Sequence, residues 1–262
     1  MSPRSDGARA VKGQNWPDAH TDIFGRTREL EALRLRVAQW HPFLLHGPGG
    51  VGKTLLLSAV LPSFPDILYS GSNPTPQALY RSLAEVLLSA RHPVFTKSCP
   101  KGATSLQAKG TVSLKGLLRD ALLNSKYLVV LDHLMRPSQA LAASIRELMM
   151  SWFVPVIAVA RSAHMEDVGF VLPLFPDRSD KVALRNFEPD LAAEFAAACA
   201  CREGLQAENL AQFLERVVEY SDGNPGAMLR MIRLAREPRY LHGSQIKIAP
   251  LYIDYKIGTV SG

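Results

Sequence analysis

Apolar and polar positions along this chain follow two periods, and the change from one to the other predicts strands that alternate with helices. Leu30, Leu33, Val37 and Trp40 recur at helical spacing, which predicts an amphipathic helix within residues 22–40. Continuous apolar runs such as YLVVLD are typical of strands buried on both faces of a parallel sheet. We predict strands at residues 42–47, 66–71, 127–132, 154–161 and around 170–174, and helices at residues 75–91, 112–125 and 138–152.

The pattern changes at Glu188, after which three helical segments follow one another without an intervening strand. Alternating strands and helices imply right-handed crossovers and a parallel sheet, whereas consecutive helices imply a small separate helical domain. Residues 92–110 are polar and interrupted by Gly and Pro, so we expect a loop that is either functional or disordered. The predicted organisation is a flexible arm at residues 1–20, an α/β domain at 21–187, a helical domain at 188–238 and a strand-like tail at 239–262.

The composition is that of an ordinary globular protein, since 47% of the 262 residues are hydrophobic and 21% are charged. No apolar run approaches the roughly 20 residues that cross a bilayer, so no membrane segment is expected. Cys99, Cys199 and Cys201 are too few and too irregularly spaced for a disulfide framework or a zinc site, which predicts reduced thiols and a cytoplasmic protein. The net charge of +6 and the pI near 9.3 leave contact with nucleic acid open, because the basic residues are spread along the chain.

The strongest motif is GPGGVGKT, which spans Gly47 to Thr54 between a predicted strand and an apolar helix. Glycines let successive backbone amides converge on a phosphate, and the following helix adds its N-terminal dipole. The motif predicts binding of a nucleoside triphosphate such as ATP, with Lys53 bridging the β- and γ-phosphates and the Thr54 hydroxyl ligating Mg²⁺. The residues expected to contact the nucleotide here are Gly47, Pro48, Gly49, Gly50, Val51, Gly52, Lys53, Thr54 and Leu55.

An acid ends the strand of residues 127–132, at the sheet edge where ligands of open α/β folds gather. This acid, Asp132, is expected to hold the Mg²⁺ water shell alongside Thr54. The next residue is His133, whose imidazole could orient a water or act as a base near neutral pH. It could equally be a surface residue on the turn. With no carboxylate next to Asp132, we expect slow hydrolysis.

A second basic residue is predicted at the same sheet edge, where the strand of residues 154–161 delivers Arg161. A guanidinium at this position can sense the γ-phosphate, because its fork matches phosphate oxygens and it stays charged. A solvated strand-end arginine is an equally good interpretation.

Five segments occur in an order that resembles AAA-type P-loop ATPases of the STAND and archaeal-ATPase-like branch, relatives of the origin-recognition and transposition ATPases. They are IFGRTREL, GPGGVGKT, YLVVLDH, VIAVARS and YSDGNPGAML, and the resemblance as a whole covers about residues 22–237. The resemblance implies a P-loop NTPase fold of the α/β class, with a parallel sheet of order 5-1-4-3-2 and a small C-terminal helical lid. It also implies that Ile23, Phe24, Gly25 and Arg26 line the adenine pocket and that the lid helix begins at the turn containing Pro225 and contacts the nucleotide.

This chain departs from that family pattern in two places. Many AAA-type hydrolases carry a glutamate where His133 stands, and several carry an arginine where this chain has Gly226. Arg230, one helical turn further on, is better explained as a solvated residue on a helix face. The missing arginine resembles STAND switches, which signal through further domains or partners.

These features lead to a principal function and to alternatives. The principal hypothesis is an ATP-binding switch, holding ATP or ADP, with slow hydrolysis and an output through a protein partner or a homo-oligomer. The alternative is an ATP-dependent DNA-binding ATPase of the transposition-regulator or origin-recognition type, with DNA contacted through Lys97, Lys101 and Lys109 or through Lys247 and Lys256. A degenerate scaffold is disfavoured by the intact Lys53, Thr54 and Asp132. A GTPase is disfavoured because the chain has no N-K-x-D motif.

Overall fold

The computed structural model describes residues 23–260, which divide into two compact units. The first unit contains Thr27–Gly47 and Lys53–Ala183. The second contains Ile23–Arg26, Pro48–Gly52 and the chain from Leu184 onward. The arm predicted at residues 1–20 lies outside the described residues. The helical part therefore begins close to the predicted boundary, but it also includes two short segments from earlier in the sequence.

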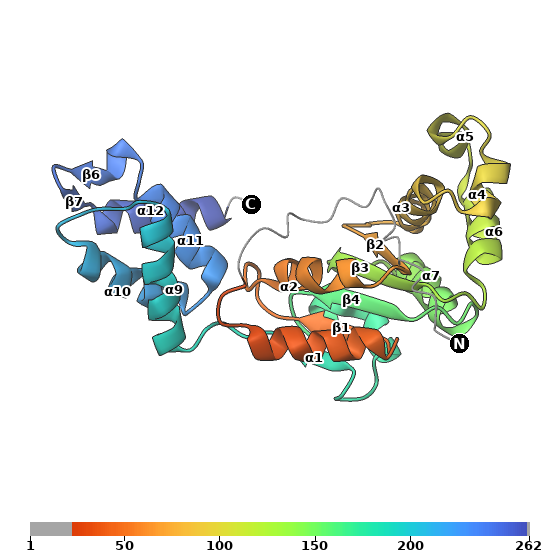
Figure 1. Ribbon diagram of the computed structural model, residues 1–262, viewed down its shortest axis with the longest axis horizontal. Helices are drawn as coiled ribbons and strands as arrows, with labels where there is room; N and C mark the ends of the chain where they lie inside the picture. The colour runs from red at the N-terminus through yellow and green to blue at the C-terminus, as the bar shows by residue number, and fades with distance from the viewer. Residues whose placement is uncertain (1–22, 261–262) are drawn as a thin grey trace, which may run out of the picture. The chain divides into compact units, whose positions relative to one another are not determined.

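A five-stranded parallel sheet forms the centre of the first unit (Figure 1). Its order is β2-β3-β4-β1-β5, which confirms the predicted order 5-1-4-3-2. The central strands are apolar and buried because helices cover the sheet, as the continuous apolar runs predicted. The strands are β1 (Phe43–His46), β2 (Ile67–Ser70), β3 (Leu128–Leu134), β4 (Val156–Ala160) and β5 (Lys181–Ala183).

Helices of the first unit follow the strands as crossover connections, and most of them lie where the apolar spacing predicts. Thr75 begins one of them, since its side chain accepts a hydrogen bond from the Ala78 amide while Pro76 occupies the first turn. The apolar faces of α3, α6 and α7 share one core cluster with β3 and β4. The helices are α1 (Thr27–Ala38), α2 (Lys53–Val60), α3 (Pro76–Ser89), α6 (Thr111–Leu122), α7 (Gln139–Met150), α8 (Met165–Val168) and the 3₁₀ turn η1 (Leu61–Ser63).

Two predictions for the first unit are corrected by the structure. The loop predicted at residues 92–110 contains two short helices, α4 (Pro93–Ser98) and α5 (Ala103–Gln107). Phe95 and Leu106 are fully buried in the core cluster, and these two apolar anchors order an otherwise polar segment. The strand predicted around 170–174 is a 3₁₀ helix, η2 (Gly169–Leu174).

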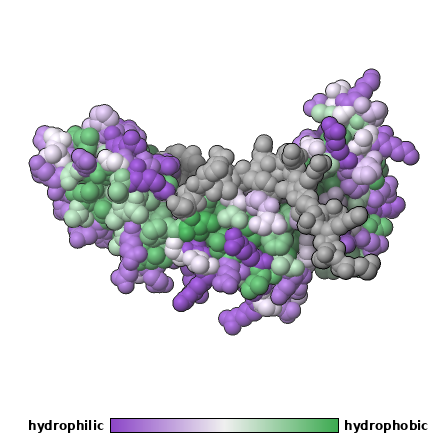
Figure 2. Space-filling model, viewed as in Figure 1, coloured by the Kyte–Doolittle hydropathy of each residue, from purple (hydrophilic) through white to green (hydrophobic). Residues whose placement is uncertain are grey.

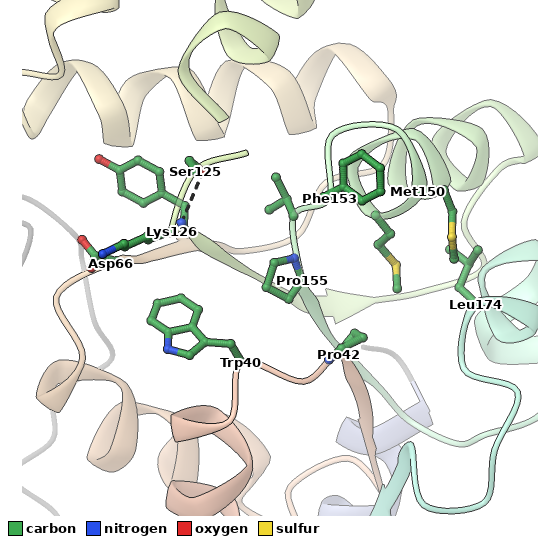
Figure 3. Close-up of a pocket in the computed structure, with 12 residues that line it drawn as sticks. Trp40, Pro42, Asp66, Ser125, Lys126, Met150, Phe153, Pro155 and Leu174 are labelled. Carbon is green, nitrogen blue, oxygen red and sulfur yellow. Dashed lines mark hydrogen bonds between the residues drawn. The ribbon is translucent and has the colours of Figure 1, made fainter. Parts of the chain in front are cut away.

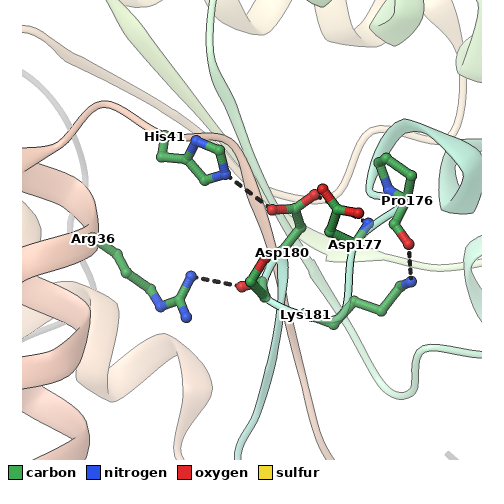
Figure 4. Close-up of polar contacts among 7 residues, drawn as sticks. Arg36, His41, Pro176, Asp177, Asp180 and Lys181 are labelled. Atoms are coloured by element: carbon green, nitrogen blue, oxygen red, sulfur yellow. Dashed lines mark hydrogen bonds and ion pairs between the residues drawn. The ribbon is translucent and has the colours of Figure 1, made fainter.

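The true fifth strand, β5, is short and is fixed beside β1 by polar contacts (Figure 4). Arg36 donates from Nη1 to the Ser179 carbonyl over 2.7 Å, and His41 Nε2 lies 2.9 Å from Asp180 Oδ1. The Asp180 carbonyl in turn accepts from the Leu44 amide at 2.7 Å. The hydrogen bond with His41 holds the pKa of the Asp180 carboxyl below its usual value.

The second unit contains the three predicted consecutive helices, α9 (Pro189–Arg202), α10 (Leu210–Ser221) and α11 (Pro225–Leu234). Their buried faces meet around Phe213, Met228 and Ile232. Cys199 is buried and Cys201 is exposed, as expected for two residues on different faces of a helix.

The tail predicted as strand-like at 239–262 begins with the turn η3 (Pro238–Tyr240) and a very short hairpin, β6 (Leu241–His242) with β7 (Gln245–Ile246). It then forms a helix, α12 (Ile248–Val260), because Pro250 suits a first helical turn and Leu251 and Tyr255 pack into the core. Across the described residues, no helix is long and apolar enough to cross a membrane.

Candidate nucleotide-binding site

The glycine-rich loop connects β1 to α2, as the motif requires. α2 begins at Lys53, so its N-terminal amides adjoin the loop. Gly52 has a φ of 102°, a backbone conformation that residues with a Cβ rarely adopt. Within the loop, the Val51 amide donates to the Pro48 carbonyl over 3.3 Å. The loop therefore has a glycine where its backbone conformation requires one.

Lys53 is held at the start of α2 by a hydrogen bond from its Nζ to the Gly47 carbonyl, at 2.6 Å. Burial lowers the pKa of its ammonium, Asp132 opposes that shift and Arg161 adds to it. These electrostatic contributions place Lys53 in the field of both Asp132 and Arg161, the arrangement predicted for a phosphate-binding lysine beside a metal-binding acid. A negatively charged ligand would offset the repulsion between the positive charges of Lys53 and Arg161.

Asp132 is a buried acid that several donors hydrogen-bond. It is 2% exposed, and its two carboxylate oxygens accept hydrogen bonds from three donors. Thr54 Oγ1 donates to Oδ2 over 2.8 Å and the His133 amide donates to Oδ1 over 2.7 Å. The sheet thus brings together Thr54 and Asp132, the pair that the sequence assigned to Mg²⁺. A hydroxyl and a carboxylate are oxygen ligands of the kind that Mg²⁺ prefers.

The third donor, Tyr69, was missed by the sequence analysis. Its hydroxyl lies 2.8 Å from Asp132 Oδ2 and comes from β2, the neighbour of β3 in the sheet. Burial, followed by the Asp132 charge, raises the pKa of Tyr69, so the phenol stays a hydrogen-bond donor. The register pairs Tyr69 with Val130, two residues before the acid, and only this register shows that the two side chains meet.

His133 sits on a bulge at the end of β3. Leu131 pairs with Ala158 and Leu134 with Ala160, so Asp132 and His133 together face a single residue of β4. His133 has a φ of 55°, which is uncommon for a residue with a side chain, and its side chain is 62% exposed. Its Nε2 lies 3.8 Å from Asp132 Oδ2. The backbone amide of His133 thus supports the acid, while the imidazole faces solvent.

Two further charged or titratable groups lie near the loop. Arg161 directly follows β4 and is exposed, and its charge lowers the pKa of Lys53. His46 ends β1, and burial is the largest cause of its lowered pKa, followed by the charges of His164, Lys53 and Lys181. Lys53 and Arg161 therefore add positive charge at this sheet edge, a distribution suited to an anionic ligand.

The segment Ile23–Arg26, which the resemblance places at the adenine, packs within the second unit. Phe24 makes edge-to-face contacts with Phe187 and Phe195 at centroid distances of 6.5 and 5.5 Å. Arg26 is 7% exposed, lies 4.4 Å over the Phe187 ring and donates to the Arg185 carbonyl at 2.6 Å. The aromatic cluster gives this segment a fixed conformation.

Pro225 is the first residue of α11, as the resemblance implied, and Asn224 caps that helix. Arg230 points along the same helix toward the C-terminal part of the unit, where it donates to the Gly258 carbonyl at 3.3 Å. This contact agrees with the interpretation of Arg230 as a residue on a helix face.

A cavity of about 700 Å³ in the first unit lies elsewhere (Figure 3). Pro42, Asp66, Tyr127 and Pro155 each directly precede a strand, so the cavity lies at the amino ends of the strands. The glycine-rich loop follows β1 and Asp132 lies near the carboxyl end of β3, at the opposite edge. The lining is mostly apolar and consists of Trp40, Pro42, Asp66, Ser125, Lys126, Tyr127, Met149, Met150, Phe153, Val154, Pro155 and Leu174.

A parallel sheet of this order, a glycine-rich loop after the first strand and an acid near the end of the third define a P-loop NTPase fold. Solved structures agree. A Walker-type ATPase of Pyrococcus abyssi is 19% identical with a TM-score of 0.61, and the match covers 92% of this chain and 74% of that chain. The Orc1 protein of Aeropyrum pernix, solved in complex with DNA, is 16% identical with a TM-score of 0.59, covering 95% and 68%.

A third similar structure is a Signal Transduction ATPase with Numerous Domains (STAND) protein from Pyrococcus horikoshii that has a tetratricopeptide repeat sensor. It is 14% identical with a TM-score of 0.50, and the match covers 91% of this chain but 33% of that one. At these identities the likeness establishes the fold. No protein-family model and no curated protein sequence matches the chain.

Proposed function

We propose that this protein is an ATP-binding switch with slow ATP hydrolysis. The observation that carries the proposal is the contact of Thr54 with Asp132 at 2.8 Å, next to Lys53 at the start of α2. These three side chains supply a cation for the β- and γ-phosphates and two oxygen ligands for a metal. ATP and Mg²⁺ would bind together, because the phosphates would complete the coordination of the metal.

Thr54 and Asp132 would hold Mg²⁺, which when bound neutralises charge on the phosphates. Tyr69 and the His133 amide would keep the Asp132 carboxylate in one orientation, since both donate to it. Lys53 would exchange its bond with the Gly47 carbonyl for phosphate oxygens. Arg161 would sense the γ-phosphate from the end of β4. For the base, the segment Ile23–Arg26 with its ring of Phe24 offers an aromatic face.

Slow hydrolysis follows from the position after Asp132. A general base contributes about 10²–10⁴-fold to a rate, and the side chain at this position is an exposed imidazole. ATP would therefore persist long enough to act as a signal. Residues 48–52 of the loop belong to the same compact unit as the C-terminal helices. A change in the loop when a nucleotide binds would therefore affect that unit directly. The output would pass to a protein partner or to a second copy.

The test is calorimetric titration of the protein with ATP and ADP, with and without Mg²⁺, beside steady-state phosphate release. We expect ATP binding tighter than millimolar that depends on Mg²⁺, with turnover well below one per second. Absence of binding at millimolar ATP would refute the proposal. Turnover of several per second would refute the switch and make the protein an ordinary ATPase.

The second candidate is an ATP-dependent DNA-binding ATPase, and the charge of one segment favours it. Between residues 86 and 119 the chain has six Lys and Arg residues and no Asp or Glu. This stretch forms α4, α5 and α6, past α3 on the side of β2, where the surface is largely hydrophilic (Figures 1 and 2). Arg81 fixes the segment by donating to the carbonyls of Leu106, Gln107 and Lys109. A rigid cationic surface of this kind suits phosphate contacts.

DNA binding can be tested by its salt dependence with ATP, with ADP and without nucleotide. If the α4–α6 segment contacts phosphates, the triple variant Lys97→Ala, Lys101→Ala and Lys109→Ala would bind more weakly and reduce the slope of log K against log salt by about 2–3. The matched variant Lys247→Ala with Lys256→Ala removes charge from the other candidate segment. DNA binding that is absent in all nucleotide states would eliminate this candidate.

A further inference from the structure

The first turn of α11 is hydrogen-bonded to the phosphate loop within the second unit. Asn224 Nδ2 donates to the Gly49 carbonyl over 3.0 Å and to Asn186 Oδ1 over 3.1 Å. The other end of the same amide works differently, because Oδ1 accepts from the Ala227 amide at 3.0 Å and caps the helix. Asn224 is 8% exposed, and its side chain uses both its donors and its acceptor.

A second bond runs parallel to the first. The Gly226 amide donates to the Gly50 carbonyl over 3.0 Å. A Cβ built on Gly226 would lie 2.8 Å from the Gly50 oxygen and 2.9 Å from its Cα, closer than carbon atoms approach backbone. No side chain fits at this position while the contact is kept. This explains why the chain has glycine where several AAA-type hydrolases have arginine.

The two carbonyl bonds set the direction of two amides of the loop. In a trans peptide the carbonyl and the following N–H point in opposite directions. A Gly49 carbonyl held by Asn224 therefore turns the Gly50 N–H away from α11, and a Gly50 carbonyl held by Gly226 does the same for the Val51 N–H. In the structure the Val51 N–H points back to the Pro48 carbonyl. Phosphate loops bind their ligand through such amides, so their direction matters for affinity.

We infer that Asn224 is a positioning residue for the phosphate loop, with Gly226 as its backbone partner, so that their bonds to the Gly49 and Gly50 carbonyls tune ATP affinity. The inference rests on the proposed function. It identifies two residues that determine ATP affinity, and their bonds to the loop connect the loop with α11. Asn224 caps α11 through Oδ1 and contacts the loop through Nδ2. A substitution can therefore remove the loop contact and keep the helix cap.

Asn224→Ser keeps a good helix cap and removes the Nδ2 donor. We expect it to fold with nearly wild-type stability and to bind ATP about 3- to 10-fold more weakly, the effect of one lost neutral hydrogen bond. Ser138→Ala is the control, since Ser138 caps α7 through the Leu141 amide. It should lower stability and leave ATP affinity unchanged. Equal ATP affinity of Asn224→Ser and wild type would overturn the inference, as would equal weakening by Ser138→Ala.

A glycine pair tests the backbone partner. Gly226→Ala should weaken ATP binding more than Asn224→Ser does, because its Cβ displaces the Gly50 backbone. Gly116→Ala is the matched control, because Gly116 also lies in a helix and a Cβ there meets no atom within 4 Å. An ATP affinity that is unchanged in Gly226→Ala would contradict the inference.

A readout without nucleotide separates this inference from the proposed function. In the nucleotide-free protein, Asn224→Ser should shift the NMR amide resonances of Gly50 and Val51 and speed their hydrogen exchange, and Ser138→Ala should not. If the wild-type protein fails to bind ATP, the proposed function is refuted. These amide measurements still test whether Asn224 and Gly226 orient the loop. Unchanged resonances and exchange rates of the Gly50 and Val51 amides in Asn224→Ser would overturn the inference that Asn224 orients the loop.

Discussion

The Thr54 hydroxyl donates a hydrogen bond to Asp132 Oδ2 over 2.8 Å, although the two residues lie 78 positions apart in the sequence. The contact arises because parallel strands present their carboxyl ends at one edge of the sheet, with only β4 between β1 and β3. It brings a hydroxyl and a carboxylate to the N-terminus of α2, where a phosphate loop ends. The following predictions test what this arrangement does.

Lys53→Ala should reduce the affinity for MgATP by about 10–100-fold or more, because a charge-assisted contact with phosphate is lost. The fold should survive, since Lys53 makes its hydrogen bond to a loop carbonyl and not to the core. Calorimetry with ATP measures the affinity and thermal melting measures the fold. Lys101→Ala, an exposed lysine of the α4–α6 segment, is the control and should bind ATP like the wild type. MgATP affinity that survives Lys53→Ala would contradict the assigned role.

Tyr69→Phe should weaken the binding of MgATP about 10-fold, because Asp132 loses one of the three donors that fix its carboxylate. The defect should appear as a higher Mg²⁺ requirement at constant ATP concentration. Tyr127→Phe is a matched control, since Tyr127 lies at the opposite end of the neighbouring strand β3. Identical Mg²⁺ titrations for Tyr69→Phe and wild type would remove Tyr69 from the metal site.

The sequence predicts the parts of this site that are defined by local pattern. The run FLLHGPGGVGKT predicts a strand, a loop and a helix in succession, and YLVVLD predicts the strand whose carboxyl end carries Asp132, so Lys53, Thr54 and Asp132 follow directly. Tyr69 could not be predicted, because its contact depends on strand register. β5 has three residues and begins with a lysine, so it gives no apolar run.

Contacts between segments that are distant in the sequence could not be predicted either. Asn224 reaches the Gly49 carbonyl across 175 positions, and the sequence shows only a GNP turn. The segment at residues 248–260 was predicted as strand-like because its apolar residues alternate. It forms a helix instead, which packs Leu251 and Tyr255 into the core. Local patterns therefore predicted the candidate phosphate- and metal-binding residues, whereas the side chains that contact and orient them emerged only from tertiary structure.

His133→Glu should accelerate phosphate release, because a carboxylate beside Asp132 can polarise the attacking water, and a general base is worth about 10²–10⁴-fold. His133→Ala should change the rate little, since the imidazole is largely exposed. His133→Gly is a structural control, because glycine relieves the positive φ and should stabilise the fold by up to about 1 kcal/mol. A His133→Ala variant that hydrolyses ATP much more slowly than the wild type would instead identify His133 as the base.

Acid should weaken the first unit partly through Asp180. Its folded pKa lies below the unfolded value of about 3.9, so its stabilising contribution is present above that value and is lost as the pH falls through the folded pKa. Asp180→Asn should therefore be less stable than wild type at pH 7, by about 1 kcal/mol or less because His41 is half exposed, and this difference should shrink at pH 3. Denaturant titrations at both pH values measure it. A difference that grows on acidification would contradict this sign.

ATP and ADP should produce different protection from hydrogen exchange in the helical residues of the second unit. Residues 48–52 of the phosphate loop group with these helices, and Asn224 and Gly226 bond directly to loop carbonyls. A γ-phosphate that orders the loop amides should therefore slow exchange at the first turn of α11, and the effect should spread toward α9 through their shared core. In Asn224→Ser the loop should still gain protection while α11 gains less, because the connecting bond is gone. Ser138→Ala should behave like the wild type. Exchange profiles of α9 to α11 that are the same in the nucleotide-free, ADP and ATP states would eliminate the switch and leave a protein that binds ATP without changing its helical unit.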